Sequence, residues 1–343
     1  MIAIIADDFS GAAELAGIAA TQGFKAEVHT KFAPESDADV IAVDTNTRLL
    51  TADEAARITG KVTQRLVRQR PLWIYKKTDS VMRGHVRAEI EAILNVTGQK
   101  ECLFIPANPS KGRVIVDGRY FIGDTPLDQT LFAHDPHFPR RSSVVGELLG
   151  PSKKIRIPNT RAAADLDQKP DACTLPAGAA DFFESLLRHE VSKMAVPSSV
   201  ATSPSGETRA LLLCGSLAAW EQGRAEEMRQ GGFIVQTLGE DLPPDLWRST
   251  RKLMLAIGRP AQTDGAILTE RLIDSALPLI VEDTNLRIGL EGGATAMALI
   301  RRIGWTRFEV IPEGHLGVGT LRPRGGPVLC VKPGSYPWPA GCL

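Results

Sequence analysis

Two adjacent aspartates, Asp7 and Asp8, follow the apolar segment 2–6 and precede a Ser-Gly pair at 10–11. The apolar segment is typical of a buried strand, and the alanine-rich segment after it is typical of a helix. Ligands of open α/β sheets bind beyond the carboxyl ends of the strands, so carboxylates at this turn could bind substrate hydroxyls or act as a general base. The alternative is that Asp8 or Ser10 only caps the helix. Two adjacent aspartates exceed the need for one cap, which favours a site.

A second polar segment, 76–84, has the sequence Lys-Lys-Thr-Asp-Ser-Val-Met-Arg-Gly and follows another strand pattern. Its lysines could offer an anionic ligand a point charge, and its arginine a planar fork. One such charge-assisted bond is worth about 1.5–3 kcal/mol. The alternative is a solvated basic loop. A further strand end near residue 48 and the loop 106–113 are weaker candidates for the same role. The residues predicted to bind substrate are Asp7, Arg48, Lys77, Ser80, Lys111 and Arg113.

Glycine-rich turns in the second half of the chain could hold a phosphate. Glycines let backbone amides approach phosphate oxygens, and the amino end of a following helix favours negative charge. A lone Gly-Gly pair before a helix is a weak signal. Neither GxxxxGK[ST] nor GxGxxG occurs, so the sequence lacks the standard nucleotide fingerprints. The residues predicted to bind the nucleotide are Ser216, Gly292, Gly293, Ala294, Thr295 and Gly334.

Short apolar runs alternate with helical patterns along the whole chain, which predicts an α/β fold with mainly parallel sheets. We expect strands at 2–6, 25–30, 40–43, 73–76 and 102–105, and an irregular stretch at 106–141 that is functional or mobile. We expect helices at 11–23, 52–70, 86–94 and 177–189. In the second half we expect strands at 210–214, 232–237, 308–311 and 328–331, and one near 279–281. Helical patterns fall at 220–230, 248–255, 267–277 and 296–303.

The length of 343 residues suggests two domains, because single hydrophobic cores stop growing near 250–300 residues. A cluster of Pro, Ser and Thr between them is the best linker candidate. We therefore predict an N-terminal domain, 1–195, a linker, 196–208, and a C-terminal domain, 209–343.

The composition narrows the class of protein. Forty basic residues balance forty acidic ones, which argues against a general nucleic-acid or membrane-surface binder. The five cysteines are scattered and include no CxxC pair, which predicts reduced thiols and neither disulfides nor a zinc site. With no signal-peptide pattern and no apolar run of about 20 residues, we expect a cytoplasmic protein.

Taken together, these motifs resemble the four-carbon acid sugar kinase family (DUF1537), and the resemblance spans essentially the whole chain. The ADD-(T/S)-G-A start of that family is similar to 6–12 here, and K-K-x-D-S-x-x-R-G is similar to 76–84. The P-A-x-P-x-x-G-R loop is similar to 106–113. The C-terminal turns at 215–216, 292–296 and 332–334 also match.

The resemblance implies a phosphotransferase with an alcohol acceptor, which phosphorylates a terminal hydroxyl of threonate or erythronate with ATP and Mg²⁺. It implies that the N-terminal domain holds the sugar acid, that the C-terminal domain holds ATP, and that both ligands bind in the cleft between the domains. We expect Asp8, Asp79 and Arg83 to be catalytic: Arg83 would hold the carboxylate, and Asp8 or Asp79 would orient or deprotonate the attacking hydroxyl. We expect no nucleic-acid or membrane partner, and a homodimer stays open.

Two alternatives remain. A haloacid-dehalogenase-like phosphatase also has an aspartate after an N-terminal strand, but it needs two aspartates separated by one residue. Here Asp7 and Asp8 are adjacent, and their side chains are expected to diverge in an extended segment. A non-catalytic sugar-acid sensor is the second alternative, because Ala294 and the segment 332–336 differ from the family pattern in the nucleotide loops.

Overall fold

The computed structural model of the protein describes residues 1–191, 209–240, 246–259, 264–283, 285–315, 317–334 and 337–343. Contacts divide the chain into two compact units, Met1–Ser198 (unit 1) and Ser199–Leu343 (unit 2). The predicted linker, 196–208, lies outside the described residues.

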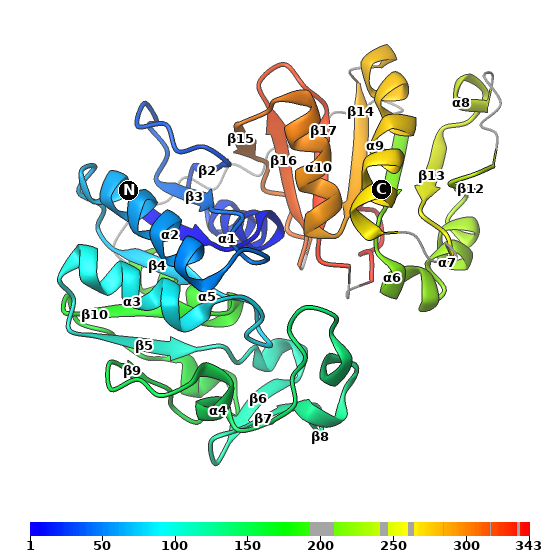
Figure 1. The fold of residues 1–343 in the computed structure, drawn as a ribbon. Coiled ribbons are helices and arrows are strands. Elements are labelled where there is room, and N and C mark those ends of the chain that lie inside the picture. Colours follow the sequence, from blue (N-terminus) through cyan, green and yellow to red (C-terminus); the bar gives the residue numbers. More distant parts are fainter. Residues whose placement is uncertain (192–208, 241–245, 260–263, 284, 316, 335–336) are drawn as a thin grey trace. The chain divides into compact units, whose positions relative to one another are not determined.

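Unit 1 is built on a parallel sheet with the strand order β2-β3-β1-β4-β10-β5-β9 (Figure 1). Its central strands are buried along their whole length, because helices pack on the sheet; α1 also packs against α5, and α2 against α3. The strands are β1 (Ile2–Ala6), β2 (Ala26–His29), β3 (Val40–Asp44), β4 (Ile74–Lys77), β5 (Glu101–Ile105), β9 (Ile155–Arg156) and β10 (Thr174–Gly178). The main helices are α1 (Phe9–Thr21), α2 (Ala52–Val67), α3 (Val86–Thr97) and α5 (Ala180–Val191).

A small antiparallel sheet lies between β5 and β10 in the chain. It consists of β6 (Arg113–Val116), β7 (Arg119–Ile122) and β8 (Thr125–Pro126). Short helical turns surround it: η1 (Pro109–Lys111), η2 (Leu127–Gln129), η3 (Leu131–His134), α4 (Val145–Leu149) and η4 (Ala163–Leu166). The expectation of an irregular stretch at 106–141 was therefore wrong in part, because short strands with few residues per face leave little periodicity to detect.

Unit 2 has a second sheet, with the order β12-β13-β11-β14-β17-β16-β15. The first five strands are parallel, and β16 and β15 are added antiparallel. The strands are β11 (Arg209–Cys214), β12 (Ile234–Thr237), β13 (Lys252–Ala256), β14 (Leu286–Glu291), β15 (Arg307–Val310), β16 (Gly319–Pro323) and β17 (Val328–Lys332). The helices are α6 (Leu217–Glu221), α7 (Arg224–Gln230), α8 (Leu246–Ser249), α9 (Gly265–Glu282) and α10 (Gly293–Ile303).

The predicted α/β fold with mainly parallel sheets is confirmed, but several elements of unit 2 were predicted wrongly. The helix expected at 248–255 is α8 followed by strand β13, because a buried sheet position overrides the helix propensity of Leu and Met. The strand expected near 279–281 is the last turn of α9, which continues past Pro278. The helix expected at 220–230 is divided into α6 and α7 at Gly223, whose φ is 87°. Strands β14 and β16 of unit 2 were missed, and so were β9 and β10 of unit 1.

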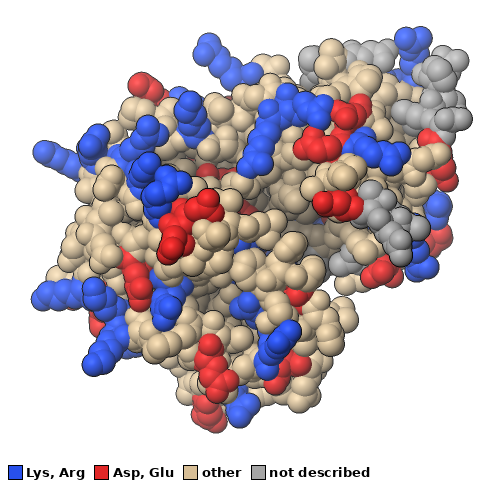
Figure 2. Space-filling view, in the orientation of Figure 1, with Lys and Arg blue, Asp and Glu red and all other residues tan. Residues whose placement is uncertain are grey.

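Basic and acidic side chains alternate over the face drawn in Figure 2, and neither sign covers a large region there. This mixture agrees with the balanced composition. Among the described helices, none has the length and apolar character that crossing a bilayer requires.

Candidate functional site

Three parallel neighbours, β3, β1 and β4, end at one edge of the sheet in unit 1. Ala6, the last residue of β1, lies opposite Asp44 on β3 and Lys77 on β4. Parallel strands in register bring the segments that follow them together. The turn at 7–8, the loop at 45–48 and the loop at 78–84 therefore lie close to one another, as their contacts below show.

Arg48 binds both aspartates of the first turn. Its Nε lies 2.7 Å from Asp7 Oδ2, and its Nη2 lies 3.0 Å from Asp7 Oδ1 and 2.8 Å from Asp8 Oδ1. The expectation that the two aspartate side chains diverge was thus wrong, because both carboxylates turn towards one nitrogen of Arg48. Burial acts to raise the pKa of Asp7, but the charges of Arg48 and Lys76 outweigh it and lower that pKa.

Asp8 also caps α1. Its carboxylate accepts hydrogen bonds from the backbone N–H of Gly11 at 3.1 Å and from the hydroxyl of Ser10 at 2.5 Å. A side chain on residue 11 would place its Cβ 2.7 Å from Asp8 Oδ1 and would displace that carboxylate from its present position. The capping role and the contact with Arg48 occur together, which leaves Asp8 only 14% exposed.

Asp79 and Arg83 form the second ion pair of this edge. Arg83 Nη2 lies 2.7 Å from Asp79 Oδ1, while Asp79 Oδ2 accepts the backbone N–H groups of Val81 and Arg83. Burial acts to raise the pKa of Asp79, but Arg83 and then Arg48 hold it well below its usual range. Asp79 is therefore a firmly ionised group that fixes Arg83. We call Asp7, Asp8, Arg48, Asp79 and Arg83 the strand-end cluster.

The predicted residues Lys77 and Lys111 meet on Glu14 of α1. Their Nζ atoms lie 3.1 Å and 2.7 Å from its carboxylate, which is almost fully buried. Burial acts to raise the pKa of Glu14, but the two lysines outweigh it and lower that pKa to about 2. Sequence reasoning missed Glu14. The available signal was a single charged residue within the apolar first turns of a helix.

Loop residues 127–140 add an aromatic ring to the predicted cations. The guanidinium carbons of Arg83 and Arg113 lie 5.8 Å and 5.7 Å from the ring centre of Phe132, within cation–π range. Arg113 also donates to the hydroxyl of Ser80, and Arg83 lies 3.5 Å from the carboxylate of Asp135. Sequence reasoning named this loop only as functional or mobile, so Phe132 and Asp135 are additional residues.

Three polar atoms near these groups are buried and have no hydrogen-bond partner in the described parts of the chain. They are Asp44 Oδ2, Thr78 Oγ1 and Arg83 Nε. Buried polar atoms are nearly always bonded in folded proteins, so such exceptions point to a binding site. All three follow or end β3 and β4.

In unit 2, the predicted glycine turns also meet. A Cβ added to Gly215 would lie 2.1 Å from Thr295 Oγ1, and one added to Gly334 would lie 2.4 Å from Ser216 Oγ. The Gly292 turn, with φ of 102°, leads into the amino end of α10. Gly215, Ser216, Gly292, Thr295 and Gly334 form what we call the glycine cluster.

A fully buried ion pair lies next to the glycine cluster, at the ends of β14 and β17. Glu291, the last residue of β14, lies 2.5 Å from Lys332 Nζ at the end of β17 and 2.9 Å from Arg224 Nε. Burial lowers the pKa of Lys332, although Glu291 acts in the opposite direction. The backbone N–H of Gly292 donates to the carbonyl of Lys332 at 3.0 Å. These contacts fix the two turns against each other.

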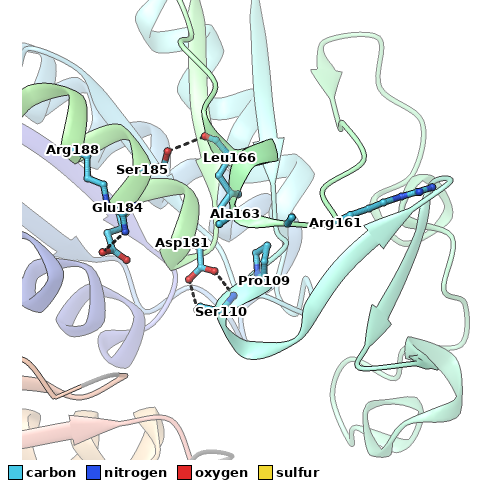
Figure 3. A pocket seen from close by; sticks show the side chains of 10 residues that line it. Pro109, Ser110, Arg161, Ala163, Leu166, Asp181, Glu184, Ser185 and Arg188 are labelled. Atoms are coloured by element: carbon cyan, nitrogen blue, oxygen red, sulfur yellow. Dashed lines mark hydrogen bonds and ion pairs between the residues drawn. The ribbon is translucent and has the colours of Figure 1, made fainter.

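A cavity of about 340 Å³ lies beside the loop that carries Lys111 (Figure 3). Asp181 accepts two bonds from Ser110 there, at 2.8 Å from its N–H and 2.7 Å from its hydroxyl. None of the predicted site residues lines this cavity. The bonds between Ser110 and Asp181 join η1 to the start of α5. In the described ranges, no group of three or more His, Cys, Asp or Glu could hold a metal ion.

A family model described as a sugar-binding N-terminal domain matches residues 2–196. The chain belongs to this family, and the resemblance to four-carbon acid sugar kinases is thereby confirmed. Among curated relatives, a D-threonate kinase from Salmonella typhimurium is 31% identical over 157 residues, which cover 45% of this chain. In that alignment the chain spans only 37% of the relative's length.

Two further comparisons cover almost the full chain. A 3-oxo-tetronate kinase from Methylobacterium radiotolerans is 22% identical over 97% of this chain and 95% of its own. The crystal structure of Haemophilus influenzae protein HI1011, of the DUF1537 family, has a TM-score of 0.74 at 16% identity. It covers 98% of this chain and 97% of that one, so the two proteins share a fold.

Proposed function

We propose that the protein is an ATP-dependent kinase that phosphorylates a terminal hydroxyl of a four-carbon sugar acid. The observation that carries the proposal is the strand-end cluster, where two arginines and three aspartates meet and where Arg83 Nε is buried without a hydrogen-bond partner among the described residues. Such a site can bind a molecule that has both an anionic end and several hydroxyls. The names of the relatives, D-threonate kinase and 3-oxo-tetronate kinase, support this substrate class.

Unit 1 is the proposed sugar-acid domain, and Arg83 is its proposed carboxylate ligand. Arg48 donates to both Asp7 and Asp8. In the described parts of the chain, Arg83 has one N–H, at Nε, without a partner, and its side chain is 27% exposed. Phe132 packs on the guanidinium and limits its orientations. In this proposal the same ligand is also contacted by the other predicted substrate-binding residues, which are Lys77, Ser80, Lys111 and Arg113.

Asp8 is the better proposed general base of the two candidates. Asp79 is held ionised at an unusually low pKa by Arg83, so it would be a poor acceptor of a proton. In the proposed step, the substrate hydroxyl attacks the γ-phosphorus of ATP, the bond to the β-phosphate oxygen breaks, and Asp8 takes the hydroxyl proton. Asp79 keeps Arg83 oriented throughout.

Unit 2 is the proposed ATP domain, and the glycine cluster fits phosphate groups. The absence of a Cβ at Gly215 and Gly334 lets these turns approach Thr295 and Ser216 closely, and the N-terminus of α10 favours an anion there. The amides of residues 292–295 would cradle the phosphates. Mg²⁺ would be held mainly by phosphate oxygens and would offset their charge. The predicted position of both ligands between the units stays a prediction.

The test is an ATP-consumption assay of the full chain with D-threonate, D-erythronate and 3-oxo-tetronate as acceptors. We expect ADP to form only with Mg²⁺ and one or more of these acids, and mass spectrometry to detect an acid heavier by one phosphate. ADP formation that does not depend on the acid, or no turnover with any short aldonate, would contradict the proposal. Release of phosphate from sugar phosphates without ATP would instead support the phosphatase, and sugar-acid binding without ATP binding the sensor.

A further inference from the structure

Asp44, the last residue of β3, is a buried carboxyl group that has no role so far in the proposed reaction. It is 3% exposed and lies opposite Ala6, which is the residue directly before the Asp7–Asp8 turn. Its Oδ1 accepts the backbone N–H of Asn46 at 2.8 Å, and its Oδ2 has no partner within the described residues. Asn46 has a left-handed φ of 47°, so this bond holds a strained turn.

The charges around Asp44 disfavour its ionisation. The charges of Asp8 and Asp7, in the turn after β1, act on it, and Arg48, the cation that acts in the opposite direction, is already bonded to both of those aspartates. On the β2 side, His29 is opposite Val43 and is bonded to Glu27. No ion pair reaches Asp44 in the described structure. Burial first, and then the charge of Asp8, raise the pKa of Asp44 to about 8.

We propose that Asp44 is a positioning residue that acts as a neutral carboxyl: Oδ1 holds the turn that presents Arg48, and the retained proton prevents a further negative charge beside an anion-binding site. The effect of Asp44 on binding of the sugar acid rests on the proposed function. Loss of this proton at alkaline pH would place a third carboxylate charge next to Asp7 and Asp8. An anionic substrate would then bind more weakly.

The first test compares Asp44→Asn with Asp44→Ala in steady-state kinetics with D-threonate between pH 6.5 and 9.5. Wild-type KM for the acid should rise about tenfold per pH unit above pH 8, because only the protonated form binds well. Asn is neutral at every pH and retains an oxygen for the Asn46 N–H, so its KM should change less than threefold over this range. Ala loses the turn contact, so its KM should be raised at every pH. Equal profiles for wild type and Asp44→Asn, or equal defects in the two variants, would overturn the inference.

The second test needs neither ATP nor sugar acid. Asp ionises near pH 4 in unfolded chains and near pH 8 at this site, so the wild type should lose stability as pH rises through that window. The Tm of Asp44→Asn minus that of the wild type should therefore increase from pH 5 to pH 8 and level off above it. Asp124→Asn, at an exposed position in the β7–β8 turn, is the matched control and should show a constant difference. A Tm difference between Asp44→Asn and the wild type that does not change with pH would contradict the inference.

The two tests separate this inference from the proposed function. If no short aldonate is phosphorylated but the Tm difference still grows, the kinase proposal fails and the neutral carboxyl stands. If the acid is phosphorylated but the Tm difference is constant, the kinase proposal stands and the role of Asp44 is wrong.

Discussion

At the scale of single residues, the two arginines of the strand-end cluster are held differently. Arg48 donates three hydrogen bonds to Asp7 and Asp8 and is 19% exposed at its side chain. Arg83 is bound on one side by Asp79 and touches Phe132 with its face, and its Nε has no hydrogen-bond partner among the residues that the structure describes. This difference supports the proposal that Arg83, and not Arg48, binds the ligand.

Replacing Arg83 by Ala should raise KM for the sugar acid by tenfold or more and change kcat less, because one charge-assisted bond of about 1.5–3 kcal/mol is lost. Arg83→Lys keeps the charge without the planar fork and should recover only part of the affinity. Steady-state kinetics with the acid as varied substrate measure both effects. Arg161→Ala, an exposed change outside the cluster, is the control. An unchanged KM in Arg83→Ala would refute the assigned role.

Asp8→Asn and Asp79→Asn should separate the general base from the positioning residue. Asn is as good a helix cap as Asp, so the first change keeps the cap of α1 while it removes the basic oxygen and the charge that pairs with Arg48. Asp8→Asn should lower kcat about 10²- to 10⁴-fold, the usual contribution of a general base. Asp79→Asn should mainly raise KM, because it loosens Arg83. Initial rates at saturating ATP give both values, and the opposite pattern would reassign the base to Asp79.

At the scale of elements, glycine turns bring distant segments of unit 2 together. Gly215 follows β11, Thr295 lies in α10 and Gly334 follows β17, yet their atoms leave no room for one added carbon. Gly215→Ala should therefore raise KM for ATP at least tenfold and leave KM for the sugar acid unchanged. Gly265→Ala is the matched control, because a Cβ there meets nothing within 4 Å. Calorimetric titration with ATP provides the check, and equal affinities for the two variants would contradict it.

Much of unit 1 could be predicted from the sequence, because its signals are local. The strands at 2–6 and 102–105 are apolar runs, and the candidate residues follow strand ends directly. Strand β10 was missed because it has only five residues and lies between a polar loop and α5. Only glycine fits at position 178, because a Cβ there would lie 2.0 Å from the carbonyl oxygen of Ile105. That constraint comes from a strand distant in sequence. The contacts of Glu14, Phe132 and Asp44 were unpredictable for the same reason.

At the scale of the whole molecule, each unit buries a lysine–glutamate pair at the end of a parallel strand. Lys76 lies 2.7 Å from Glu89 in unit 1, and Lys332 lies 2.5 Å from Glu291 in unit 2. Such pairs contribute little net stability, but removal of one partner typically costs about 3–5 kcal/mol. They fix the strand ends on which the candidate sites are built.

Acid should destabilise the protein partly through Glu14. Its folded pKa of about 2 lies below the value near 4.3 of unfolded chains, so its contribution is complete above about pH 5 and is lost as pH falls towards 2. The contribution is about 3 kcal/mol by the same linkage. Glu14→Gln should be less stable than the wild type at pH 7, and the gap should narrow as pH falls below 5. Urea unfolding at each pH measures the difference in free energy of unfolding between Glu14→Gln and the wild type. A difference that does not change with pH would contradict the low pKa of Glu14.

The ion pairs of the strand-end cluster have a thermodynamic consequence for recognition. Arg48, Asp7 and Asp79 are immobilised by one another before any ligand arrives, so little side-chain entropy remains to be lost on association. The difference in binding free energy between stereoisomers would then be mainly enthalpic. A misplaced hydroxyl would contact charged side chains that are held in place and cannot rearrange to accommodate it. A small acid with few contacts could in this way be selected sharply.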